Sequence, residues 1–434
     1  CTTALAGSSC RRILTWADTN YDKVVGSGEV IELTAANKTT LCPYLAASTV
    51  LYCASTNATL IDGAAITADA SLTHCFGLTR ATCAQTVASN LIKFHRGDDG
   101  TTLCTDAANP ASCLRDRSSA VKDPDNPAAA ALQKVWKYGD VVDSTPTVVG
   151  SPKERYDTIY GDATYTTYFK QYKTRRQVAY AGANDGMLHA FNAGFFTEGD
   201  DSTTTPVEHG FFSTTAPSSV SSYTTARSST PKLGSELWAF IPQELLPHLK
   251  WYADINYTHV AYVDLKPKVT DVRVFCGDSA TGGLGSPTTC ITGQPGAGIH
   301  PGGWGTILIG GMRYGGSCGA CVAGSTGGVP MAVTADFGSG SQTTRTFYSS
   351  YFVLDITDPE QDPVLLWTFT DATLGLGTSF PAIARVSPVA DVKTDNTNAV
   401  WYAVFGSGPT GYTGISSQKA KFFVVDIARG PTYN

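Results

Sequence analysis

The sequence predicts an all-β protein: an incomplete β-propeller that follows a small, disulfide-rich region of mixed α and β structure. Two observations support this fold class. Short apolar strands recur in one order along residues 139–434, and eight of the twelve cysteines lie within the first 113 residues. We therefore expect two parts, an N-terminal region at 1–138 and a partial propeller of about three blades at 139–434.

The repeat is clearest at a predicted β-hairpin over residues 178–192. Two apolar runs, 178–181 and 187–191, flank Asn184-Asp185-Gly186, whose residues tolerate positive φ and close a tight turn. Related pairs of strands recur, with glycine at the end of the first strand and aspartate at the end of the second. They occupy residues 306–311 with 351–355, and residues 401–406 with 422–426.

One further strand precedes each pair, and another follows the first two pairs. The preceding strands share a Ser-x-Pro start at 144–149 and 379–384, with a degraded copy at 266–269. The following strands share Leu-Trp-x-Phe and lie at 236–240 and 365–369. Four antiparallel strands per unit, with long Ser/Thr/Gly-rich insertions between them, are typical of propeller blades.

The third unit lacks its fourth strand, because the sequence stops at Asn434 soon after the strand at 422–426. An open propeller leaves bare strand edges, which favour pairing or aggregation. We therefore expect this chain to be part of a larger polypeptide or assembly, in which a further segment or another chain completes the propeller.

The cysteines favour disulfide bonds and an oxidising compartment, because their number is even and most lie in a loop-rich region. The candidates are Cys1, Cys10, Cys42, Cys53, Cys75, Cys83, Cys104, Cys113, Cys276, Cys290, Cys318 and Cys321. Zinc is a weaker interpretation, since the N-terminal spacings contain no repeated Cys-x-x-Cys pair and only His74 and His95 lie nearby. The connectivity does not follow from the sequence.

Residues 18–29 match the ligand register of a twelve-residue calcium loop. The predicted Ca²⁺ ligands are the side chains of Asp18, Asn20, Asp22 and Glu29 and the main-chain carbonyl of Val24. Lys23 departs from this pattern, because its position usually needs glycine for a sharp turn and a cation there opposes the ion. The alternative is a solvated turn of the Asx type. No organic cofactor is expected.

A short amphipathic helix is predicted over residues 84–94, since apolar side chains recur there at helical spacing. It stops at Gly97, within the tripeptide Arg96-Gly97-Asp98 that integrins recognise. In an adhesin this motif would matter only on an exposed loop. The alternative is a helix terminus, with glycine at the stop and a solvated aspartate.

Charge and hydropathy exclude two classes of partner. The net charge of −6 and pI near 5.6, with scattered Lys and Arg, give no electrostatic case for binding nucleic acid or a membrane surface. No apolar run approaches the roughly 18 residues that span a bilayer, and no charged-then-apolar signal stands at the start. We expect a mature or internal fragment of a soluble protein.

Five segments in order carry a family resemblance. They are 137–146, 180–191 with Tyr-Ala-Gly-Ala-Asn-Asp-Gly-Met-Leu-His-Ala-Phe, 236–242, 304–311 with Trp-Gly-Thr-Ile-Leu-Ile-Gly-Gly, and 351–359. They closely resemble the C-terminal propeller of the PilY family, the type IV pilus tip-associated adhesins. Residues 12–18 with the acidic loop also look like the region that precedes this propeller.

The resemblance implies an extracellular protein at the pilus tip, with a modified propeller of about seven blades. It implies that the protein cooperates with minor pilins, promotes pilus extension or opposes retraction, and supports attachment and surface sensing to a ligand that the sequence does not name. Two family features are missing from this sequence: the von Willebrand A-like domain and a downstream Asp-rich calcium loop. Calcium control would therefore rest on residues 18–29.

A quinoprotein dehydrogenase is the first rival, because propellers of this sequence type also resemble those enzymes. Trp238 and Trp367 are poor candidates for stacking on a quinone, since they stand at equivalent packing positions. Cys318-Gly-Ala-Cys321 lacks the strand-to-helix context of a redox pair, and His189 is most simply a core or hairpin residue. We predict no enzymatic activity; a structural part of an extracellular fibre is the second rival.

Overall fold

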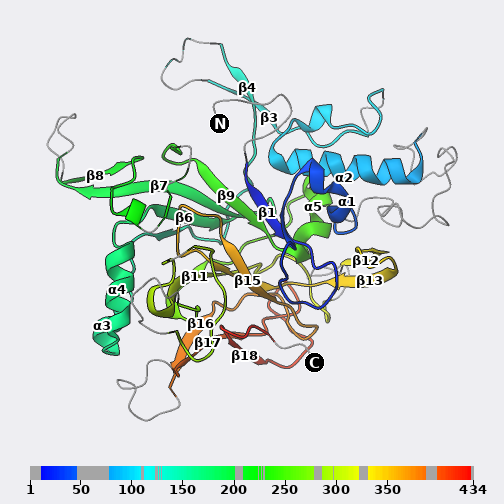
Figure 1. The fold of residues 1–434 in the computed structure, drawn as a ribbon. Coiled ribbons are helices and arrows are strands. Elements are labelled where there is room, and N and C mark those ends of the chain that lie inside the picture. Colours follow the sequence, from blue (N-terminus) through cyan, green and yellow to red (C-terminus); the bar gives the residue numbers. More distant parts are fainter. Residues whose placement is uncertain are drawn as a thin grey trace.

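Strands predominate in the fold, as the repeat predicts (Figure 1). The computed structural model describes residues 11–45, 78–108, 112–122, 126, 128, 130–200, 209–222, 224–225, 227, 230–277, 286–296, 298–321, 331–387 and 398–431. None of the helices in these ranges is long and apolar enough to cross a membrane.

The first sheet contains the predicted first unit. Its strands in spatial order are β2 (Val30–Glu32), β1 (Ile13–Trp16), β9 (Glu236–Ile241), β7 (Leu188–Glu198), β6 (Gln177–Gly182) and β5 (Thr147–Val149), with β8 (Gly210–Ser213) paired to the far end of β7. The predicted hairpin joins β6 to β7, and Gly186 in its turn has φ 95°. Strand β1 adds to the sheet parallel to β9, a pairing for which the sequence gives no repeat signal.

The second sheet is the second predicted unit in the predicted order. It runs β10 (Lys268–Arg273), β11 (Trp304–Gly311), β14 (Tyr351–Asp355) and β15 (Val364–Phe369), with every neighbour antiparallel. The connection from β11 to β14 carries a separate hairpin, β12 (Met331–Asp336) with β13 (Gln342–Phe347). This hairpin reaches the N-terminal region, where the ring of Phe337 packs on that of Tyr44 with centroids 5.0 Å apart.

The third sheet has three antiparallel strands, β16 (Ala382–Val386), β17 (Val400–Gly406) and β18 (Phe422–Asp426). Within the described ranges no strand pairs with the outer edge of β18. Alternate side chains of β18 face outward, and Phe422 and Val424 are 81% and 61% exposed. The predicted bare edge is therefore present in this structure, and Figure 1 shows it at the lower rim of the molecule.

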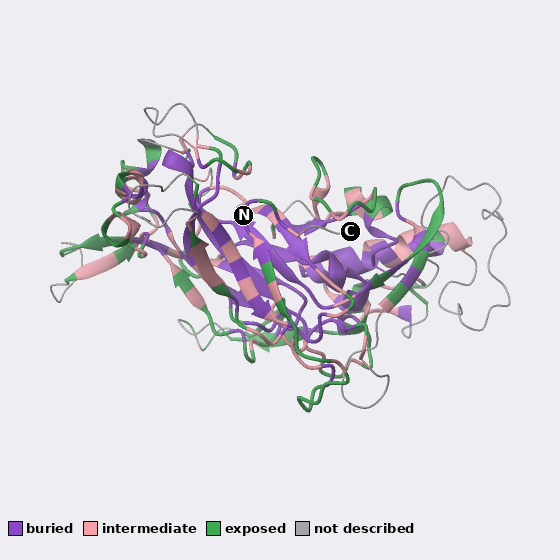
Figure 2. Ribbon diagram, turned by 90° about the horizontal axis from the view of Figure 1, so that it is seen from below, coloured by how far each residue is buried: buried purple, intermediate pink, exposed green. Residues whose placement is uncertain are grey.

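The three sheets pack face to face through alternate residues of the second sheet. Leu308 and Phe352 belong to the core that the second sheet shares with the first. Ile307 and Tyr351, one position away on the same strands, belong to the core shared with Trp401 and other residues of the third. This follows from the two-residue period of a strand, because both faces of the middle sheet are covered. The cores run through the centre of the molecule in Figure 2.

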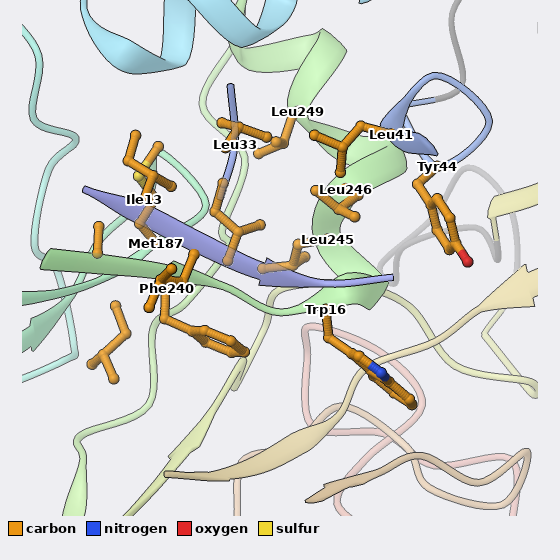
Figure 3. Close-up of a cluster of buried hydrophobic side chains, with 14 of the residues drawn as sticks. Ile13, Trp16, Leu33, Leu41, Tyr44, Met187, Phe240, Leu245, Leu246 and Leu249 are labelled. Carbon is orange, nitrogen blue, oxygen red and sulfur yellow. The ribbon is translucent and has the colours of Figure 1, made fainter. Parts of the chain in front are cut away.

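The described part of the N-terminal region packs on the first sheet, and most of its buried apolar residues belong to the core of that sheet. Its helices are α1 (Lys38–Leu41) and α2 (Arg80–Arg96), and Thr79 caps α2 by accepting the N–H of Thr82. Figure 3 shows Ile13 and Trp16 beside Phe240 of β9 and the turn of 3-10 helix η7 (Gln243–His248). All these apolar side chains belong to one buried cluster.

The remaining elements are short. They are α3 (Tyr156–Ile159), α4 (Ala163–Tyr172), α5 (Leu249–Tyr252), the 3-10 helices η1 (Ala35–Asn37), η4 (Gly100–Thr102), η6 (Val220–Ser222) and η9 (Pro301–Gly303), and a ribbon of β3 (Ser118–Val121) with β4 (Leu132–Val135). No sheet in the described ranges closes on itself, so the ring of a propeller stays a prediction.

Candidate functional site

The predicted calcium loop, residues 18–29, follows β1 directly and wraps back on itself. Lys23 has φ 59° and Tyr21 has φ 60°, so lysine adopts the left-handed conformation for which glycine is usually needed. The Asp18 carboxylate accepts the main-chain N–H of Lys23 through Oδ2 at 3.1 Å. The sharp turn that seemed to require glycine is therefore made without it.

Local N–H groups occupy most oxygen atoms of this loop. Asp22 Oδ1 accepts from the N–H of Val24 at 2.8 Å, and Glu29 Oε2 accepts from Gly26 at 2.8 Å and from the indole of Trp16 at 3.2 Å. An ion would have to replace these donors. No three Asp, Glu, His or Cys side chains among the described residues gather as metal ligands. The geometry is that of a hydrogen-bonded turn, and calcium binding stays a prediction.

Asp18 is fixed by residues from distant parts of the chain. Its main-chain N–H donates to Gln243 Oε1 at 2.7 Å, and its carbonyl accepts from Tyr44 Oη at 2.6 Å and from the guanidinium of Arg345. Arg345 comes from β13 and stacks over the ring of Tyr21 at 4.4 Å. The N-terminal loop, η7 and the β12–β13 hairpin therefore meet at one carboxylate residue.

A cavity of about 260 Å³ lies at this junction. Its lining comprises Trp16, Asp18, Tyr21, Lys23, Gln243, Glu244, Thr344, Arg345, Thr346, Phe347, Tyr348, Thr368, Thr370, Asp371 and Ala372. Burial raises the pKa of Glu244 to about 7, and burial also raises the pKa of Asp18. Sequence reasoning identified Asp18 but missed Glu244 and Arg345, because neither stands in a motif and tertiary packing alone brings them to the loop.

The Arg96-Gly97-Asp98 tripeptide lies at the end of α2. Gly97 is the left-handed C-cap with φ 105°, and a Cβ there would come within 2.6 Å of the Lys137 side chain. Arg96 is ion-paired with Glu32 at 3.0 Å. This placement is that of a helix terminus held against neighbouring side chains; integrin recognition remains a prediction that this geometry does not favour.

Disulfide bonds join Cys104 to Cys113, Cys276 to Cys290 and Cys318 to Cys321. Cys42 and Cys83 are also disulfide-bonded, and the described part of the chain contains no free cysteine. The other candidates, Cys1, Cys10, Cys53 and Cys75, lie outside the described residues.

His189 lies in a buried network of charges behind the first hairpin. Its Nε2 lies 3.1 Å from Asp185 Oδ1 and its Nδ1 lies 2.6 Å from Glu236 Oε1. Arg11 pairs with the same glutamate at 2.7 Å. Burial would lower the pKa of His189, but the two carboxylates outweigh it and raise that pKa. The network ties the N-terminal segment to the first sheet.

The two tryptophans considered for a quinone site occupy packing positions. Trp238 is buried in the first core, 5.7 Å from the ring of Tyr180. Trp367 is buried in the second core and donates its indole N–H to the carbonyl of Ile427 at 3.0 Å. Each side chain is enclosed by its own sheet and the neighbouring elements.

Comparison with curated proteins finds relatives of one kind. A type IV pilus biogenesis factor PilY1 homolog of Xylella fastidiosa is 25% identical over 298 residues, 67% of this chain. The type IV pilus biogenesis factor PilY1 of Pseudomonas aeruginosa is 25% identical over 302 residues, also 67% of this chain. The chain is a relative of the PilY family. The resemblance predicted from the five ordered motifs is thereby confirmed.

The chain spans only part of these family members. The matched region amounts to 15% of the Xylella protein and 16% of the Pseudomonas protein. No protein-family model matches. A crystal structure of the Pseudomonas aeruginosa PilY1 C-terminal domain aligns with 65% of this chain and 35% of its own length, at 22% identity and a TM-score of 0.33, which does not establish a shared fold.

Proposed function

We propose that this chain is part of a type IV pilus biogenesis factor that acts outside the cell at the pilus tip. The observation that carries the proposal is the match of 67% of the chain to proteins named as such factors. The disulfide bonds fit an oxidising compartment. The role is non-catalytic: the protein promotes pilus extension, attaches to surfaces and takes part in surface sensing.

The three sheets are blades of a propeller in this proposal. Support comes from their repeated strand order and from the way each sheet packs its face on the next. The next blade would cover the outward face of the third sheet, and a fourth strand would pair with β18. A further segment of the polypeptide or another chain would supply both.

Calcium at residues 18–29 is a second part of the proposal. Asp18 supports it, because its Oδ1 is buried and has no hydrogen-bond partner in the described structure. Titration calorimetry with calcium chloride tests it: we expect a binding heat for the wild-type chain and a loss of that heat in Asp22→Asn. The absence of a binding heat in both proteins would contradict calcium binding at residues 18–29.

Co-purification tests the pilus association. We expect minor pilins to be captured with this protein from a sheared surface fraction, at a ratio far below that of the major pilin, because a tip protein is present once per fibre. Capture of neither pilin would contradict the proposal, and a regular ratio to the major pilin would instead indicate a structural fibre component. A pyrroloquinoline quinone chromophore retained on gel filtration would contradict the non-catalytic role.

A further inference from the structure

The cavity beside Asp18 is built from four separate segments of the chain. The loop after β1, the start of η7, strand β13 and the residues that follow β15 each contribute side chains to its wall. Figure 1 shows β13 next to the N-terminal loop. Its volume of about 260 Å³ is many times the roughly 10–15 Å³ that one water molecule needs. The space is large enough for an organic group.

Two polar atoms of the lining residues have no hydrogen-bond partner in the described part of the chain, Asp18 Oδ1 and Arg345 Nε. Asp18 is 1% exposed; its main-chain N–H, its carbonyl and its Oδ2 are all hydrogen-bonded, but its Oδ1 is not. A buried carboxylate oxygen without a donor is unfavourable, because no hydrogen bond offsets the loss of its hydration. A donor that enters the cavity would supply that hydrogen bond, so Asp18 Oδ1 marks where a ligand would bind.

A second carboxyl group and several aromatic rings line the same space. Glu244 is 3% exposed and accepts a hydrogen bond from Ser350 Oγ at 3.2 Å. Trp16, Tyr21 and Phe347 add aromatic wall to the cavity. Carboxylates accept the N–H groups of an ammonium ion, and aromatic faces attract its charge. This combination of groups fits an organic cation.

Two cations, Arg345 and Lys23, also line the cavity, and the ammonium group of Lys23 lies 6.0 Å from the centre of the Tyr21 ring. The guanidinium of Arg345 is committed to the carbonyl of Asp18, to Tyr44 Oη at 3.0 Å and to the rings of Tyr21 and Phe337. Lys23 contributes the other side chain at the wall. A metal ion is a poorer fit than an amine, because no three acidic, His or Cys side chains of the described residues gather as ligands.

We propose that this cavity binds a primary ammonium group on a short alkyl chain, as carried by a lysine side chain or a small free amine. The ammonium group donates to Asp18 Oδ1 and to the carboxylate of Glu244, and the alkyl chain lies against the aromatic wall. This proposal stands apart from the pilus role. An ammonium group and a calcium ion would compete for Asp18 Oδ1, whereas Glu244 lies outside the 18–29 loop and would contact the amine alone.

Titration calorimetry tests the site with 1,5-diaminopentane and with Nα-acetyl-lysine N-methylamide, against the neutral analogue 1-pentanol. We expect at least one of the two amines to bind and pentanol not to bind. Binding of the diamine indicates a free amine as the natural ligand, and binding of the lysine derivative indicates a lysine side chain. The variants Asp18→Asn and Glu244→Gln should each weaken binding by about tenfold or more, because each removes a charged acceptor. Lys23→Met should strengthen it, because a like charge is removed.

Asp22→Asn is the matched control, since Asp22 lies in the same loop but not in the cavity wall. It should leave amine binding unchanged, whereas Glu244→Gln should leave any calcium heat unchanged. Circular dichroism shows whether each variant folds. If Asp18→Asn does not fold, the loss of amine binding in Glu244→Gln tests the proposal. Equal heats for pentanol and the amines, no amine binding at millimolar concentration, or full binding by Glu244→Gln would each overturn the proposal.

Discussion

The indole N–H of Trp367 donates a 3.0 Å hydrogen bond to the main-chain oxygen of Ile427. Trp367 belongs to the closing strand of the second sheet, and Ile427 follows β18 of the third. The ring also packs against Gly430, where a Cβ would lie 3.2 Å from Trp367 Cδ1. Trp367, which stands at a repeated position in the sequence, therefore links the second sheet to the third.

Replacing this tryptophan by phenylalanine should weaken the contact between the two sheets. Trp367→Phe keeps an aromatic ring but leaves the Ile427 carbonyl without its donor, so we expect a loss of about 1 kcal/mol or more in the free energy of unfolding. Urea denaturation followed by fluorescence measures it. Trp136→Phe is the control, because Trp136 is 65% exposed; equal stability losses in both variants would contradict the assigned contact.

The His189 network should make stability depend on pH. The pKa of His189 is raised above 6.5, so its contribution is complete below pH 6.5 and is lost as the pH rises through the raised value. The pKa of Glu236 is depressed below 4.5, so its contribution is present above pH 4.5 and is lost on acidification. Both contributions are complete between pH 4.5 and 6.5.

The variant His189→Gln tests this assignment. It leaves the carboxylates of Asp185 and Glu236 near each other without the imidazolium between them, and we expect a loss on the order of 3 kcal/mol at pH 6. The loss should shrink as the pH is raised above 6.5, because the stabilisation that the raised pKa of His189 provides is lost progressively there. A difference in unfolding free energy that stays constant from pH 6 to pH 9 would show that His189 is not charged in the folded protein.

Glu244 should destabilise the ligand-free protein at neutral pH. Its carboxyl pKa is raised from 4.5 to about 7, so the folded protein binds this proton more tightly than the unfolded chain does. Its contribution to stability is therefore highest below pH 4.5 and falls as the pH rises toward 7, by roughly 3 kcal/mol for a shift of this size. Glu244→Gln should remove this pH dependence.

Thermal unfolding of Glu244→Gln and wild type at pH 4.5 and pH 8 provides the measurement. The glutamine variant should gain stability relative to wild type as the pH rises. A variant that loses stability relative to wild type between these values would show that the buried carboxylate is favoured in its charged form.

The outward face of β18 should drive association of the isolated chain. Phe422 and Val424 are exposed on the same face of β18, an edge strand that has no further partner among the described strands, and such an edge favours pairing. The double variant Phe422→Ser, Val424→Ser should shift sedimentation profiles toward the monomer with little change in thermal stability. Ile159→Ser, at a 55% exposed position on α3, is the control and should leave the profile unchanged.

The repeating strands could be predicted because their signals are local. Ser144 and Ser379 were recognised only as a shared Ser-x-Pro start. In the structure Ser144 Oγ accepts the N–H of Gly182 at 2.7 Å and Ser379 Oγ accepts that of Gly406 at 2.9 Å. In both units, the serine before the first strand thus accepts a hydrogen bond from the glycine that ends the second strand. This shared contact explains why the pattern repeats.

The features of the fold and of the candidate site that could not be predicted depend on contacts between residues far apart in the chain. The parallel pairing of β1 with β9 and the position of Arg345 over Tyr21 have no local sequence signal, because each partner obeys only its own strand pattern. The loop at 18–29 was predicted by its ligand spacing, but spacing does not show which oxygen atoms already accept hydrogen bonds. Glu244 was missed for the same reason: its burial comes from the packing of three other segments.

The most direct test of the central proposal is the number of surface pili after the gene for this protein is deleted. Electron microscopy of the mutant should show few or no type IV pili, and the intact gene supplied in trans should restore them. A mutant with the wild-type number of pili, and with twitching and attachment unchanged, would contradict a role in pilus biogenesis.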